Sequence, residues 1–174
     1  VGVTGLDGNG QDDFVKILAG VQEPHGGTTE ILGSNEKFLK YNSLDDAKNN
    51  GISFVSGDRK KEGILPNLSI YENLVVPLYK KTSKAGFLGF VNWMELNGIF
   101  DWEVERLSIK TGPRDNLIGS LSGGNQQKVM IARSFAQHPK VLILNDPARG
   151  IDVSTKRDLY VHLRKYVEEG NTVV

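Results

Sequence analysis

Residues 121–152 decide the fold, and they read LSGGNQQKVMIARSFAQHPKVLILNDPARGID. Ser122 is a good helix N-cap, so the residues after it predict a helix. The apolar run Val141–Leu144 then predicts a buried strand of a parallel sheet. Asn145 and Asp146 follow at the carboxyl end of this strand, where open α/β sheets place their binding sites. The stretch therefore predicts an α/β fold with a polar site at one edge of its sheet.

The opening of the predicted helix suits a phosphate ligand. Gly123 and Gly124 have no side chains, so their backbone N–H groups are able to approach a ligand closely. The N-terminus of a helix also attracts anions through its exposed N–H groups and its dipole. The alternative is an ordinary capped helix in which Val129, Ala132 and Ala136 pack against a core. The strand and polar residues that follow favour the ligand-binding interpretation.

Three motifs in this stretch resemble those of ATP-binding-cassette (ABC) proteins. Leu121–Gln127 resembles the signature motif, Val141–Asp146 the Walker B strand, and Arg149–Asp152 the D-loop. The runs LSGGNQQK and RGID are most similar to the second (C-terminal) ATP-binding half of bacterial importers for simple sugars, the ribose, galactose and xylose class. The resemblance implies a three-layer α/β P-loop nucleotide-binding domain of ABC type. It assigns the signature to Leu121, Ser122, Gly123, Gly124, Asn125 and Gln126, and the D-loop to Gly150 and Asp152.

The composition is that of an ordinary globular domain. The chain has 174 residues with 21 basic and 21 acidic side chains, so its net charge is zero. This balance argues against nucleic acid or an anionic membrane as a direct partner. There is no cysteine, as expected of a cytoplasmic protein, and no apolar run is long enough to span a bilayer. We interpret residues 1–174 as one domain truncated at both ends, since it lacks an initial Met and stops at the predicted strand Thr172–Val174.

A motif near the N-terminus resembles a phosphate-binding P-loop. A predicted short strand, Val1–Val3, runs into a glycine-rich loop and then into a predicted helix, which is the order that cradles phosphate groups. The nucleotide-binding residues that this motif assigns are Gly5, Gly8, Asn9, Gly10, Gln11 and Asp12. The predicted helix places Phe14, Ile17 and Leu18 on one face and ends near Gly20.

This loop departs from the usual P-loop at two positions. Gln11 stands where a lysine normally reaches the β- and γ-phosphates, and Asp12 stands where a hydroxyl binds Mg²⁺. Two charges about 4 Å apart interact by roughly 4 kcal/mol at an effective dielectric near 20, before desolvation. We therefore expect at best weak ATP binding, through the backbone N–H groups of the loop. The resemblance implies the same, because the second half of these importers commonly has a degenerate Walker A motif.

The Walker B strand also ends in altered residues. An aspartate that serves Mg²⁺ and a glutamate that polarises water are usual, whereas Asn145 and Asp146 occupy these positions here. Asp146 is the remaining catalytic candidate, but its side chain is one methylene shorter, and misplacement by about 1 Å can cost on the order of 100-fold in rate. In an alternative arrangement Asp12 and Asn145 exchange roles around Mg²⁺, which keeps one carboxylate at the metal.

The other segments predict the rest of the domain. Following a predicted strand at Ile52–Val55, the loop Ser56–Gly63 resembles the EDRKxxG loop of the sugar importers, and its alternative is a solvated basic turn. A capping box at Ser69 opens a helical insertion of about 69–117, which in the family contacts the membrane-spanning subunits. Exposure of Phe87, Leu88, Phe90 or Trp93 would favour such a contact over a core position. Further predicted elements are a strand at Thr28–Leu32 and helices at Leu44–Asn50 and Val91–Ile109. In the second of these helices, the residues expected to be buried are Trp93, Phe100, Trp102 and Leu107. A last helix is expected to have Asp152 or Ser154 as its N-cap and to face the sheet with Leu159, Leu163 and Tyr166.

The resemblance implies a function for the domain. ATP binds between two cassettes, and the signature of one closes over the γ-phosphate held by the other. Because the signature is intact while Gln11, Asp12 and Asn145 are altered, we expect this domain to donate its signature to a second cassette of the same polypeptide. Its own site is expected to bind ATP and Mg²⁺ weakly or not at all, and the fragment alone to lack ATPase activity. The implied partners are permease subunits, at the cytoplasmic face of the inner cell membrane.

Two other functions stay open. One is a soluble ABC ATPase that acts on nucleic acid or the ribosome, against which the zero net charge and the lack of a basic stripe argue. The other is a non-catalytic interaction module that has lost nucleotide function. Measured ATP affinity would separate this module from the importer domain, and a salt-sensitive affinity for DNA or RNA would favour the first alternative.

Overall fold

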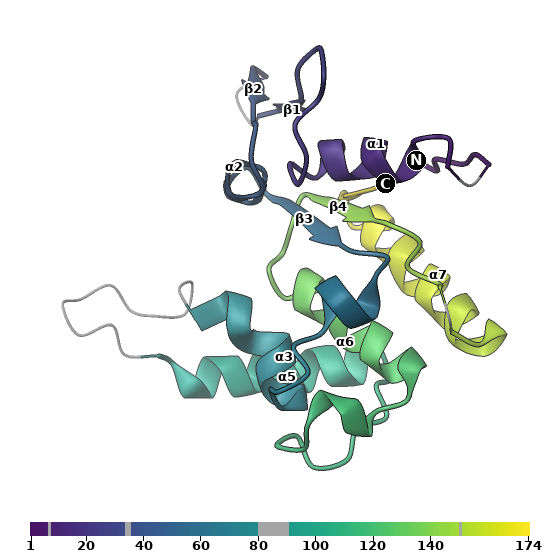
Figure 1. The fold of residues 1–174 in the computed structure, drawn as a ribbon. Coiled ribbons are helices and arrows are strands. Elements are labelled where there is room, and N and C mark those ends of the chain that lie inside the picture. The colour runs from purple at the N-terminus through teal and green to yellow at the C-terminus, as the bar shows by residue number, and fades with distance from the viewer. Residues whose placement is uncertain (7, 34–35, 80–90, 150) are drawn as a thin grey trace.

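The centre of the fold is a parallel sheet with the strand order β3-β4-β5 (Figure 1). The computed structural model describes residues 1–6, 8–33, 36–79, 91–149 and 151–174. β3 (Ile52–Val55) pairs with β4 (Val141–Leu144), and β4 pairs with β5 (Thr172–Val173), both in parallel. The three strands predicted from apolar runs in these segments are therefore confirmed.

Helices cover both faces of this sheet. Because side chains alternate along a strand, Leu142 of β4 packs in the cluster formed with α6 and α7, while Ile143 packs in the cluster formed with α1 and α2. These helices are α1 (Gln11–Leu18), α2 (Leu44–Asn49), α6 (Gly123–Phe135) and α7 (Val153–Glu168). The arrangement is the three-layer α/β architecture expected from the sequence. No helix in the described ranges is both long and apolar enough to cross a membrane.

The helical insertion packs against α6 on the side away from α1 (Figure 1). Its elements are α3 (Ile70–Val75), η2 (Val76–Leu78), α5 (Trp93–Arg106) and η3 (Ile118–Ser120). The capping box is confirmed, since Ser69 Oγ accepts the backbone N–H of Glu72 at 3.1 Å and Glu72 Oε2 accepts the N–H of Ser69 at 2.8 Å. α3 tightens at its end into the 3₁₀ turn η2, which contains Pro77.

The predicted core of α5 is wrong at two tryptophans. Trp93 and Trp102 are 56% and 64% exposed, whereas Phe100 and Leu107 are buried as predicted. The helix buries a stripe that runs from Leu96 through Phe100 to Leu107, and Trp102 lies off this stripe. Phe87, Leu88 and Phe90 lie outside the described residues.

The N-terminal segment differs from prediction in three respects. Val1–Val3, all described, form no strand, although the N-terminal ammonium donates to Val173 O at 2.7 Å. In α1 the buried residue is Val15, while Phe14 is half exposed. The predicted strand at residues 28–32 is present as β1 (Glu30–Leu32), and it pairs antiparallel with β2 (Phe38–Lys40), which the sequence had not indicated.

Candidate functional site

The phosphate loop wraps around the N-terminus of α1 and closes on itself. Gly8 and Gly10 adopt left-handed conformations with φ of 84° and 87°, which favour glycine, and Gly10 is the N-cap of α1. Gln11 turns back onto the loop, where its Nε2 donates to Leu6 O at 3.0 Å. Its Oε1 is buried without a partner and would lie 3.3 Å from a Cβ at Gly5. Gln11 therefore fills space inside the loop and extends no charge toward a ligand.

Asp12 accepts a nitrogen donor on each of its carboxylate oxygens. Asn145 Nδ2, at the end of β4, donates to Oδ1, and Lys16 Nζ lies 2.7 Å from Oδ2. The hydrogen bonds from Lys16 and from Asn145 lower the pKa of Asp12, and Asp12 in turn raises the pKa of Lys16. The structure thus joins the two residues proposed to share Mg²⁺. Because the amide nitrogen of Asn145 faces the carboxylate, a metal with oxygen ligands would require both groups to reorient.

The pocket beside these residues is acidic. It has a volume of about 550 Å³ and includes the phosphate loop, the end of β4 and the loop after β3. Its carboxylates are Asp12, Asp13, Asp58, Glu62 and Asp146, and its cations are Lys16 and Arg149. Asp146, the catalytic candidate, is exposed, and its backbone adopts a left-handed conformation with φ of 41°. In the described part of the chain, no three His, Cys, Asp or Glu side chains are grouped to hold a metal ion.

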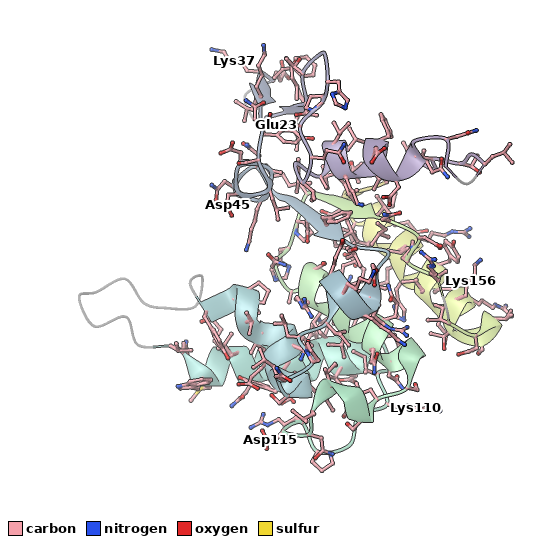
Figure 2. The ribbon with its side chains drawn as sticks, in the orientation of Figure 1. Glu23, Lys37, Asp45, Lys110, Asp115 and Lys156 are labelled. Carbon is pink, nitrogen blue, oxygen red and sulfur yellow. The ribbon has the colours of Figure 1, made fainter. Side chains whose placement is uncertain are left out.

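The signature residues open α6 away from this pocket. Ser122 is the N-cap, and its Oγ accepts the N–H of Asn125 at 3.4 Å and Asn125 Nδ2 at 3.1 Å. Gln126 Nε2 donates to Leu121 O at 2.9 Å, which holds the turn before the helix. Lys110, labelled in Figure 2, donates its backbone N–H to Asn125 Oδ1 at 3.0 Å. Among the described residues, the pocket lining contains no member of the signature.

The D-loop ends beside the signature of the same chain. Asp152 is the N-cap of α7, where its side chain accepts the N–H of Thr155 at 2.9 Å and the hydroxyl of Thr155 at 2.7 Å. The backbone hydrogen bond from Thr155 is the main reason that the pKa of Asp152 is lowered. A Cβ at Gly124 would lie 3.4 Å from Thr155 Oγ1, so α6 and α7 begin next to each other. Gly150 lies outside the described residues.

Sequence reasoning did not assign a role to Arg59. It belongs to η1 (Arg59–Gly63), a π-helical turn after β3, and its Nη1 donates to Gly123 O at 2.9 Å. Its guanidinium atoms would lie 3.0–3.3 Å from a Cβ at Gly123. The solvated basic turn was the alternative for this segment, and for Arg59 it is wrong, although Lys60 and Lys61 are exposed. Only the resemblance of the loop to EDRKxxG pointed to this residue.

Comparison with known proteins identifies the family. Residues 1–149 match the family model described as ABC transporter. The chain belongs to the ABC transporter family. The chain is similar to the ATP-binding cassette MJ0796 in a dimeric post-hydrolysis state bound to ADP and Pi. The match covers 95% of this chain and 68% of the MJ0796 chain, with a TM-score of 0.74 and 26% identity. A second dimeric structure of MJ0796, a bacterial ABC transporter cassette, has a TM-score of 0.75 at 26% identity, with the same coverage.

Curated relatives of this ABC domain carry the name "Ribose import ATP-binding protein RbsA". The protein from Roseobacter denitrificans is 36% identical over 174 residues, which are 100% of this chain and 33% of that protein. A protein from Bacillus cereus is 38% identical over 174 residues, which are 100% of this chain and 34% of that protein. The chain thus spans about a third of the length of the curated relatives that it matches.

Proposed function

We propose that this ABC domain serves an importer of simple sugars as the donor of a signature motif. Its own phosphate site is degenerate and contributes little to ATP hydrolysis. The observation that carries this proposal is the pairing inside the phosphate pocket, where Asp12 is bonded to both Asn145 and Lys16. Asp12 and Asn145, the two residues that would hold Mg²⁺, are therefore hydrogen-bonded to each other, and Lys16, a cation of the pocket, is paired with Asp12.

The charge of the pocket supports a weak nucleotide site. Five carboxylates and two cations line it, so a triphosphate meets a net negative surface. Gln11 adds no positive charge, because its amide is hydrogen-bonded to the loop. ATP and Mg²⁺ therefore bind weakly or not at all at this site, and Asp146 contributes little to hydrolysis.

The signature supports the role of a donor. Ser122 is exposed, and the first N–H groups of α6 have no acceptor within the helix. A phosphate placed there would meet these N–H groups and the positive end of the helix dipole. The signature is also separate from the residues that line the domain's own pocket. The γ-phosphate that it contacts therefore belongs to ATP bound by another cassette.

The partner is a second cassette in the same polypeptide, together with membrane-spanning permease subunits. Relatives named for ribose import are about three times as long as this chain, and the solved MJ0796 cassettes are dimeric. The domain is peripheral to the cytoplasmic face of the inner cell membrane in this proposal, and its substrate class is a monosaccharide.

The test is the sugar-stimulated ATPase rate of the assembled importer. Gly123→Asp places a carboxylate at the signature, where it repels the γ-phosphate and disturbs the first turn of α6. We expect a fall of about 10²–10³-fold, which is typical for the loss of a pre-organised donor. Gln11→Ala is the matched change in the degenerate pocket and is expected to leave the rate near that of the wild type. The proposal is wrong if Gly123→Asp has no effect while Gln11→Ala abolishes hydrolysis.

A further inference from the structure

The π-helical turn η1 is attached to α6 at both of its ends. At its first residue, Arg59 Nη1 donates to Gly123 O in the first turn of α6, at 2.9 Å. At its last residue, Gly63 O accepts Nη1 of Arg133 from the last turn of α6, at 2.8 Å. Met130, from the same helix, packs so closely on Gly63 that a Cβ there would lie 2.3 Å from its Cε. η1 is therefore fixed to α6 by a hydrogen bond at each end, with close packing of Met130 at its second end.

Arg59 occupies an unusual electrostatic position. A cation near the N-terminus of a helix is unfavourable, because that end of the helix dipole is positive. The hydrogen bond to Gly123 O offsets part of this cost, yet Arg59 Nε is buried without a partner. Arg59 also fills the space that a side chain at residue 123 would take. A glycine at 123 therefore leaves room for the arginine, which a Cβ would meet at 3.0–3.3 Å.

We propose that Arg59 is a positioning residue for the signature. Its guanidinium holds the Gly123 peptide group, and through it the orientation of the first N–H groups of α6, where the γ-phosphate of the partner's ATP is to be bound. The inference rests on the proposed function in one respect, that this signature is used by a partner cassette. The contact itself lies within this chain and is testable without a partner.

The first experiment measures hydrogen exchange in the full protein. Arg59→Ala removes the contact, and Lys60→Ala removes the same charge from an exposed neighbour. We expect Arg59→Ala to speed exchange of the amides of Asn125–Gln127 by about tenfold, because local opening of this turn becomes easier, while amides in the distal half of α6 are unchanged. Lys60→Ala leaves all of them unchanged. Equal exchange at Asn125–Gln127 in the two variants would overturn the positioning role.

The second experiment measures ATP hydrolysis by the assembled importer. Arg59→Ala is expected to lower kcat by about tenfold to 100-fold, the size of effect that a small misplacement produces, with little change in the KM for ATP. Arg59→Lys keeps the charge and one donor, and should recover most of the loss. Gly123→Asp serves as the control for the proposed function.

The outcomes separate the two ideas. If Gly123→Asp stops hydrolysis and Arg59→Ala leaves kcat at the value of Lys60→Ala, the positioning role is wrong and the proposed function stands. If Gly123→Asp has no effect, the proposed function fails, and the exchange of Asn125–Gln127 alone decides the role of Arg59. Should Arg59→Ala fail to fold, Arg59→Gln replaces it, and unchanged exchange in Arg59→Gln would overturn the inference.

A cycle of substitutions adds a steric test. Gly123→Ala in the wild type brings a Cβ within 3.0–3.3 Å of the guanidinium, so the guanidinium has to shift by a few tenths of an ångström. Once Arg59→Ala has removed that group, the same Gly123→Ala change should speed exchange at Asn125–Gln127 much less. If the effects of the two substitutions multiply independently, the contact does not govern the signature turn.

Discussion

At the residue scale, Gln11 and Asp12 change the charge of the phosphate loop by two units relative to a lysine and a hydroxyl residue. The double variant Gln11→Lys with Asp12→Ser removes the carboxylate to which Asn145 donates. It also supplies the cation that phosphate needs and the hydroxyl that Mg²⁺ needs. Because the site is open to solvent, only a fraction of the roughly 4 kcal/mol per close charge pair is realised. We expect ATP to bind at least about tenfold more tightly, a gain of about 1.4 kcal/mol.

Calorimetric titration of ATP with Mg²⁺ measures this change in affinity. Asp45→Ser is the control, because it removes an exposed carboxylate of α2 that does not line the pocket, and it should leave the affinity for ATP unchanged. A micromolar or tighter dissociation constant for the wild-type chain would show that the charge argument is wrong.

We expect Glu103 to make the stability of the domain depend on pH. It is buried in α5, one of its oxygens has no partner, and burial raises its pKa to about 7 from the ordinary 4.5 despite Arg106 nearby. A carboxyl that holds its proton more tightly in the folded state stabilises that state below the unfolded pKa, and this stabilisation is lost as the pH rises from 4.5 through 7. The shift corresponds to roughly 3 kcal/mol.

Glu103→Gln removes this titration. Urea unfolding at pH 5 and pH 8 should show that the glutamine variant gains roughly 3 kcal/mol on the wild type as the pH rises. Glu105→Gln, an exposed change on the same helix, should show no such gain. A difference between Glu103→Gln and wild type that is the same at both pH values would contradict the prediction.

At the element scale, Arg133 joins α6 to the insertion and to η1. Its Nε donates to Asn73 O at 2.6 Å, and its Nη1 donates to Gly63 O at 2.8 Å. Burial lowers the pKa of Arg133. We expect Arg133→Ala to lower the free energy of unfolding by about 3 kcal/mol, because two buried carbonyl groups lose their donor. Arg157→Ala on the exposed face of α7 should change it by less than about 0.5 kcal/mol, and comparable losses in the two variants would count against the bridging role.

The elements that formed as predicted are those with local causes. Ser69 and Asp152 cap their helices because their side chains accept N–H groups three residues later, which a short window of sequence reveals. The apolar run Val141–Leu144 has the length of a buried strand and is too short for a typical helix, so it too was predictable from a short window. β2 (Phe38–Lys40) had no such signal, since all three residues are exposed and the strand forms only by pairing with β1. Trp102 was mispredicted because hydrophobicity does not say which stripe of a helix meets a neighbour.

At the scale of the whole molecule, the site depends on contacts between distant parts of the chain. Asn145 and Asp12 are 133 residues apart in sequence, and Arg59 is 64 residues from Gly123. Motif spacing predicted which residues belong to the phosphate loop, the Walker B end and the signature. It could not reveal that Asp12 already has nitrogen partners, or that an arginine rests on the signature glycine, because both facts depend on how α1, β4, η1 and α6 pack together.

The proposed division between a degenerate pocket and a donated signature predicts how the chain behaves alone. Two copies of this domain, placed face to face, would contribute two signatures and two phosphate loops that lack the lysine. We therefore expect no phosphate release from the chain above a control without protein. Gln11→Lys with Asp12→Ser should restore binding without hydrolysis, because Asn145 and Asp146 still lack the usual carboxylates.

Adding Asn145→Asp and Asp146→Glu to that pair supplies the metal ligand and the carboxylate that polarises water. Only this fourfold variant is expected to release phosphate, at a rate that Gly123→Asp then lowers about 10²–10³-fold by damaging the signature. Steady-state phosphate release at saturating ATP, measured over a range of protein concentrations, checks both statements. Hydrolysis by the wild-type chain that Asp146→Ala abolishes would show that its own pocket is a working site, and the assignment of the domain as a signature donor would have to be abandoned.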